Sequence, residues 1–164
     1  MRGYLIRGNE IWLYVFGTAR WHGQKINGTG EFRRYTLRLD GWASLRSTAV
    51  ANATCTAGSG KVATTAWAVT KPFRWPEGSK ALRVNAAVTS GGALGIVLKP
   101  TSDSATVLPS ATAIPVSANG VDLPVVWRGE ASDVDAALRQ LQGQSVQLRF
   151  ELRNTELFSW WIES

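Results

Sequence analysis

The chain has 164 residues, of which 45% are hydrophobic, and carries a formal net charge of +6. No apolar run approaches the roughly 20 residues of a membrane-spanning helix, and Arg7 and Glu10 interrupt any apolar centre of a secretory signal. We therefore expect no membrane segment, and the compartment stays open. Cys55 is the only cysteine, which excludes an intrachain disulfide and leaves stability to the hydrophobic core.

The N-terminal residues predict two short strands, Tyr4–Arg7 and Glu10–Phe16. Gly8-Asn9 lies between them and is typical of a two-residue hairpin turn. Since the second strand is apolar on both faces, we expect it to lie between two layers. A glycine-rich loop then extends to residue 30 and contains Trp21 and His22.

Alternating patterns resume over Glu31–Leu39 and, after the turn signal Asp40-Gly41, over Trp42–Arg46. Residues 47–60 are small and polar and predict a loop or a weakly paired hairpin. Strand patterns follow at Lys61–Trp67 and Val69–Phe73.

Two further hairpins are predicted from alternating residues around polar or glycine-rich breaks. The first joins Lys80–Thr89 to Ala93–Lys99 through Ser90-Gly91-Gly92. The second joins Gln144–Arg153 to Leu157–Ile162 through three polar residues.

Between the two hairpins, residues 100–119 read as loose chain and Leu123–Trp127 as a strand. A short helix is predicted over Asp133–Leu141, with Ser132 as its N-cap and Gly143 just past its end. Many short strands with one short helix indicate an all-β fold, an antiparallel β-sandwich of jelly-roll or concanavalin-like type. The expected domains are residues 1–30, a hairpin and loop, and residues 31–164, the sandwich.

Catalytic and metal-binding patterns are sparse. A histidine relay would have to use His22, which is the only histidine, and a loop histidine is more typical of a surface residue. A carboxylate pair drawn from Glu10, Glu31, Asp40 and Asp122 is the other catalytic possibility. No zinc spacing or calcium loop occurs, although a weak carbonyl-rich calcium site stays open. We expect no cofactor, and nucleic-acid binding is disfavoured because the basic residues form no linear run.

Tryptophan is the over-represented residue, with eight copies. Trp12, Trp42, Trp127 and Trp160 lie in apolar alternation and are expected in the core. Trp21 and Trp75 lie in predicted loops, and Trp161 lies on the face of its strand opposite Trp160, so these three are expected to be exposed. Exposed indole rings are suited to stacking against sugar rings. The candidate sugar-binding residues are therefore Trp21, His22, Trp75 and Trp161.

Three stretches carry a resemblance to a known family: Glu10–Gly17 with Trp21-His22-Gly23, Tyr35–Leu45 containing Asp40-Gly41-Trp42, and Leu148–Trp160. They resemble the C-terminal region of proteins related to glycoside hydrolase families 32 and 43, in which a catalytic β-propeller precedes a β-sandwich. The resemblance implies that residues 1–30 correspond to closing strands of the propeller and the remainder to the sandwich. It also implies that the catalytic carboxylates lie outside this chain, so no catalytic residue is carried over.

Three functions follow as hypotheses. The first is a non-catalytic accessory β-sandwich that binds carbohydrate weakly or packs against another domain. The alternative is a self-associating structural or interaction protein whose N-terminal strands need a partner, either a second copy or the missing propeller. The third is an enzyme that uses His22 or a carboxylate pair. The basic charge adds an acidic polysaccharide to the possible ligands.

Overall fold

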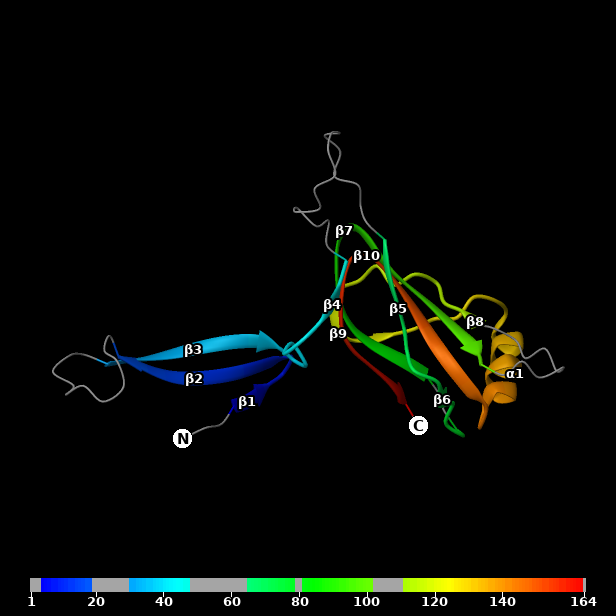
Figure 1. Cartoon of the computed structure of the whole chain (residues 1–164), viewed down its shortest axis with the longest axis horizontal. Helices are drawn as coiled ribbons and strands as arrows, with labels where there is room; N and C mark the ends of the chain where they lie inside the picture. The colour runs from blue at the N-terminus through cyan, green and yellow to red at the C-terminus, as the bar shows by residue number, and fades with distance from the viewer. Residues whose placement is uncertain (1–3, 19–29, 48–64, 79–80, 102–110, 164) are drawn as a thin grey trace. The chain divides into compact units, whose positions relative to one another are not determined.

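The computed structural model describes residues 4–18, 30–47, 65–78, 81–101 and 111–163. Contacts divide the chain into two compact units, Met1–Ala43 (unit 1) and Ser44–Ser164 (unit 2). The predicted all-β antiparallel fold with one short helix is confirmed (Figure 1). The predicted domain boundary followed residue 30, whereas the compact units divide after Ala43 because the third strand pairs with the second.

Unit 1 is a three-stranded antiparallel sheet in the order β1-β2-β3. Its strands are β1 (Tyr4–Arg7), β2 (Glu10–Thr18) and β3 (Gly30–Arg38). The predicted turn at Gly8-Asn9 is confirmed, because Arg7 pairs with Glu10 across it and Gly8 has a φ of 57°. The second predicted turn is also present: Asp40 has a φ of 57°, and Gly41 N–H donates to the Arg38 carbonyl at 2.8 Å.

The register of unit 1 sorts its side chains onto two faces, since antiparallel partners share a face and successive residues alternate. We call one the aromatic–arginine face; besides Leu5, Glu10 and Thr36, it carries four aromatic residues and three arginines: Trp12, Tyr14, Phe16, Phe32, Arg7, Arg34 and Arg38. We call the other the apolar face; it carries the ion pair of Glu31 and Arg33 near one end and, along most of its length, Tyr4, Ile6, Ile11, Leu13, Val15, Tyr35 and Leu37.

The expectation that β2 lies buried between two layers is wrong for most of the strand. Tyr14, Val15 and Phe16 are each about half exposed, and of the described β2 side chains only Ile11 is buried, at 3% exposure. Trp42, expected in the core, is 59% exposed and contacts only the Tyr4 ring edge-on among the described aromatic pairs. The described part of unit 1 is a single three-stranded sheet without a second layer of its own, so most side chains of β2 stay exposed.

Unit 2 is built on two long strands, β7 (Ala81–Pro100) and β10 (Ser145–Glu163), which pair with each other near both ends and on both sides of a central interruption. The other strands flank them: β4 (Leu45–Arg46), β5 (Ala66–Val69), β6 (Phe73–Arg74), β8 (Ala111–Thr112) and β9 (Gly120–Pro124). Figure 1 shows β7 and β10 side by side, with the flanking strands on either side of them.

The two predicted hairpins of this region are wrong. Residues 89–92 of β7 and Asn154 of β10 do not reverse the chain; they interrupt the register at the same level, between Arg153↔Ala93 and Thr155↔Val88. Gly91 has a φ of 70° and Asn154 a φ of 46°, so each strand bends where its partner bends. The predicted turns are therefore a shared bend in two paired strands.

The bend divides the seven-stranded sheet into two half-sheets. Half-sheet A contains β4, residues 155–163 of β10, residues 81–88 of β7, and β9. Half-sheet B contains β5, β6, residues 145–153 of β10, residues 93–100 of β7, and β8. A single hydrophobic core takes side chains from both, including Leu82 and Val84 of A and Leu98 and Leu148 of B. A bent sheet that encloses one core in this way is a two-layer antiparallel arrangement.

Helix α1 (Ala131–Leu141) closes one side of the core with Val134, Leu138 and the fully buried Leu141. It starts earlier than predicted, after Glu130, and Ser132 is inside its first turn instead of capping it. Gly143 follows the helix with a φ of 71°, as the predicted glycine stop requires. None of the helices among the described residues is long and apolar enough to cross a membrane.

Candidate functional site

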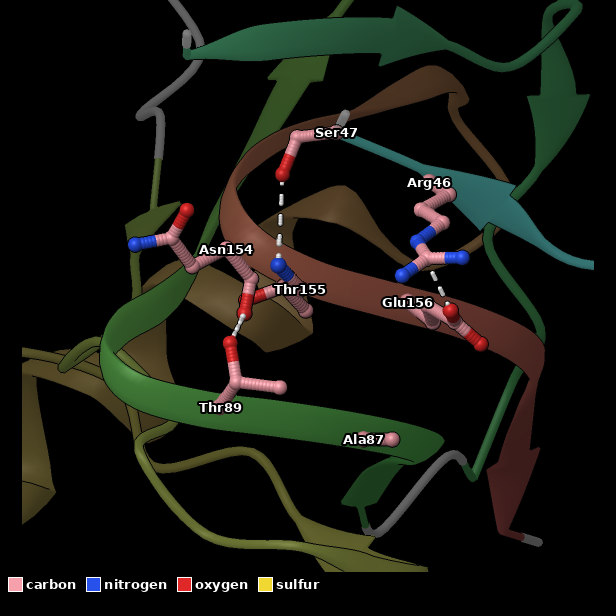
Figure 2. A pocket seen from close by; sticks show the side chains of 7 residues that line it. All are labelled: Arg46, Ser47, Ala87, Thr89, Asn154, Thr155 and Glu156. Atoms are coloured by element: carbon pink, nitrogen blue, oxygen red, sulfur yellow. Dashed lines mark hydrogen bonds and ion pairs between the residues drawn. The ribbon is translucent and has the colours of Figure 1, made fainter. Parts of the chain in front are cut away.

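The bend of β7 and β10 holds a polar pocket of about 360 Å³. Figure 2 shows its seven lining residues, which come from β7, β10 and the chain around β4: Arg46, Ser47, Ala87, Thr89, Asn154, Thr155 and Glu156. The arrangement follows from the register, since β4 pairs with β10 at Glu156↔Arg46 and Leu157↔Leu45.

The polar groups of this pocket bind mainly one another. Ser47 Oγ accepts from Thr155 N–H at 3.2 Å, and Thr89 Oγ1 donates to the Asn154 carbonyl at 2.9 Å. Arg46 pairs with Glu156 at 2.9 Å. These contacts hold the bend together across three strands, so we interpret the pocket as structural rather than as the ligand site.

A second depression of about 400 Å³ lies on the outer face of half-sheet B, and we call it the Trp67 platform. It is lined by side chains from β5, β7 and β10: Trp67, Val69, Lys99, Gln147 and Arg149. The register explains the grouping, because Arg149 pairs with Val69, Gln147 pairs with Lys99, and Trp67 lies opposite Glu151.

The strand β5 has its large side chains outside and its small ones inside. Ala66 and Ala68 share the core side with Leu152 and Phe150, while Trp67 is 66% exposed and Val69 is 45% exposed. Among the described strands β5 pairs only with β10, so it forms an edge of half-sheet B. Because the Trp67 ring is exposed at an edge and does not pack in the core, it is available to a ligand.

The polar neighbours of Trp67 are positioned by their own contacts. The Arg149 guanidinium carbon lies 5.7 Å from the Trp67 ring centroid, and Arg149 also pairs with Glu151 at 2.9 Å. Gln147 Nε2 donates to the Thr70 carbonyl at 2.9 Å, which fixes the amide. The exposed Lys99 completes the set. A flat ring beside an amide and two cations can stack on a ligand ring and bind its oxygens at the same time.

The sequence-predicted binding residues do not form a cluster. Trp21 and His22 lie outside the described residues. Trp75 is buried at 2% exposure, so the expectation that its ring is exposed is wrong. Trp161 is exposed at 37%, as expected, but lies on half-sheet A opposite Arg83, whose guanidinium pairs with Asp122 and Glu163. The structure places Trp161 and Trp67 on different half-sheets.

The predicted core tryptophans have mixed outcomes. Trp127 is buried at 9%, and Trp160 packs against the core, with its ring centroid 5.4 Å from Phe73 and 6.2 Å from Phe150. Trp12 is half-buried beneath two arginines, and Trp42 is exposed. The prediction for Trp127 is therefore confirmed, whereas that for Trp42 is wrong.

The candidate catalytic carboxylates are separated or already paired. Glu10 and Glu31 lie at opposite ends of the β2–β3 ladder, opposite Arg38 and Gly17. Glu10 accepts from Trp12 Nε1 at 2.7 Å, and Asp122 pairs with Arg83 at 3.3 Å. Among the described residues, no group of three histidine, cysteine or acidic side chains is close enough to hold a metal.

Comparison with known proteins gives no match. No protein-family model matches the chain, and no curated protein or solved structure is significantly similar to it.

Proposed function

We propose that unit 2 is a non-catalytic β-sandwich module that binds carbohydrate weakly at the Trp67 platform. The observation that carries the proposal is the outward Trp67, 66% exposed beside Gln147, Lys99 and Arg149. An indole ring stacks on the C–H face of a sugar, and the three polar side chains suit its hydroxyls. The resemblance to accessory sandwiches of propeller glycosidases supports the same role.

Replacing Trp67 by alanine is expected to weaken sugar binding about tenfold, because the stacking surface is lost. Affinity electrophoresis of the full chain in gels that contain neutral plant or microbial polysaccharides measures the retardation. Trp161→Ala is the matched control, since it removes an exposed tryptophan from the other half-sheet. Retardation that survives Trp67→Ala but disappears with Trp161→Ala would move the site to half-sheet A, and no retardation of the unmodified chain would refute sugar binding.

The second candidate function is self-association through the apolar face of unit 1. Tyr4, Ile6 and Tyr35 are 56%, 60% and 49% exposed on this face, and neighbouring exposed apolar side chains of this kind mark interaction surfaces. The sheet also has edge strands available for pairing. The resemblance suggests a propeller domain as the alternative cover, since sheets of a propeller pack face to face.

Light scattering with size-exclusion chromatography tests self-association. The full chain is expected to form dimers at tens of micromolar protein, and Ile6→Lys is expected to yield monomers because a buried lysine at the interface would lose its hydration. Leu5→Lys is the matched control, because Leu5 is similarly exposed but lies on the opposite side of β1. A monomeric unmodified chain at this concentration would contradict the second candidate.

A further inference from the structure

The aromatic–arginine face of unit 1 presents two arginines fixed on one indole ring. The guanidinium carbons of Arg34 and Arg7 lie 4.4 Å and 5.3 Å from the Trp12 ring centroid. Trp12 Nε1 donates to Glu10 at 2.7 Å, which holds the ring in place. Cation–π contacts orient a guanidinium but leave its N–H donors free for an anion.

Neither of these two arginines forms an ion pair within the described part of the chain, although Glu10 pairs with Arg7 in the register and lies on the same face. The ion pairs found there involve other arginines, namely Arg33, Arg46, Arg83 and Arg149. Arg33 is the instructive contrast, because it neighbours Arg34 on β3 but projects to the opposite face and pairs with Glu31. That hydrogen bond to Glu31 raises the pKa of the Arg33 guanidinium.

Exposed rings continue the same face beyond the arginines. Tyr14 pairs with Arg34 in the register and is 49% exposed. Phe16 and Phe32 pair next to it, with 52% and 80% exposure and ring centroids 5.0 Å apart. Free cations and apolar rings therefore follow one another along β2 and β3, which suits a long ligand that carries both negative charges and ring surfaces.

We propose that the aromatic–arginine face binds an acidic polysaccharide, a polymer of uronic-acid rings. A uronate carboxylate matches the planar fork of a guanidinium, and the C–H faces of its rings match Tyr14, Phe16 and Phe32. Single-stranded nucleic acid fits less well, because the two phenylalanine rings are tilted by 54° and share no plane for successive bases. This site lies in unit 1 and does not depend on sugar binding at the Trp67 platform.

Isothermal titration of the full chain with polygalacturonate and with alginate tests the proposal. Arg34→Gln is expected to weaken binding about tenfold, because one charge-assisted carboxylate contact is lost. Arg7→Gln should act in the same direction and serves as the second variant if Arg34→Gln does not fold by circular dichroism. Arg33→Gln is the control: it removes the same charge from the neighbouring residue on the opposite face and should leave the affinity within about twofold.

The charge and the site are tested separately. Fully methyl-esterified polygalacturonate keeps the rings without the charges and should bind at least about tenfold more weakly, and affinity for the acidic polymer should fall as salt rises. Trp67→Ala should not change this binding, which distinguishes it from the proposal for unit 2. The inference is overturned if neither acidic polymer binds, if Arg33→Gln weakens binding as much as Arg34→Gln, or if an oligothymidylate binds through Arg34 while both acidic polymers do not.

Discussion

Replacing Trp75 by alanine is expected to destabilise unit 2 by about 3–5 kcal/mol, because it leaves a large cavity in the core. The Trp75 side chain is 2% exposed and belongs to the core cluster, with its ring centroid 6.4 Å from Phe73. Its backbone is fixed as well: Trp75 N–H donates to the Gln144 carbonyl at 2.9 Å, and Gly143 N–H donates to the Trp75 carbonyl at 2.8 Å.

Urea unfolding followed by far-ultraviolet circular dichroism measures this loss, and sugar affinity of the folded fraction should stay unchanged. Trp75→Phe is the informative second variant. Trp75 Nε1 is buried without a hydrogen-bond partner in the described structure, so phenylalanine would remove ring volume but also an unpaired polar group. We expect Trp75→Phe to cost less than half as much as Trp75→Ala. A stable Trp75→Ala protein with lost sugar binding would instead make Trp75 a ligand residue.

The fate of Trp75 shows what local sequence cannot decide. The Trp75-Pro76 sequence is typical of a loop, which favours exposure. The hydrogen bonds that place the ring in the core come from Gly143 and Gln144, almost 70 positions later in the chain. Burial here is set by a partner that only the folded chain brings near.

The long strands show the same dependence on distant partners and also what sequence can predict. Alternation in Leu82–Val88 and Val146–Leu152 predicted the core-facing residues of both strands, and the side chains of Leu82, Val84, Val146 and Leu148 are fully buried. A glycine-rich or polar break in such a pattern is compatible with a hairpin turn or with a bend. The choice depends on whether the two flanking segments pair with each other or with a common partner, and that information lies outside both segments.

Bulges in β10 also change which of its alternating side chains face the core. A register shift between Leu157 and Ser159 places two steps of β10 against one step of β7. Leu157 is therefore buried with the residues before the shift, while Trp160 and Ile162 pack on the core after it. Simple alternation placed Leu157 and Trp160 on opposite faces, because it cannot detect an inserted residue.

The Trp67 platform has a signal in the sequence, although Trp67 was not among the predicted binding residues. Ala66-Trp67-Ala68-Val69 alternates small and large side chains, and a core strand would place the large ones inside. Here the core side is already filled by Phe150 and Leu152, whose register partners are alanines. Recognising that the small side chains face inward requires knowing the neighbouring strand, so the pattern alone could suggest Trp67 but not establish its exposure.

Replacing Gly92 by alanine is expected to destabilise unit 2 by about 1–3 kcal/mol, because the bend has no room for a Cβ atom. A Cβ at this position would lie 2.6 Å from the Asn154 carbonyl oxygen and 2.8 Å from those of Arg153 and Thr89. All three oxygens belong to the backbone of the paired bend, so none can rotate away as a side chain would. Relief would require β7 and β10 to separate where the two half-sheets meet.

Gly95→Ala is the matched control for this test. Gly95 lies in the same strand, and the nearest heavy atom to its added Cβ is the Cβ of Glu151 at 3.3 Å, a contact that a small shift relieves; the next is the mobile Glu151 Oε2 at 3.5 Å. Urea midpoints should therefore fall clearly for Gly92→Ala and much less for Gly95→Ala. Equal midpoints for Gly92→Ala and the unmodified chain would mean that the strands can open at this level without cost. Such a result would contradict the tight pairing of β7 and β10 at the shared bend, and with it the single core that the bend encloses.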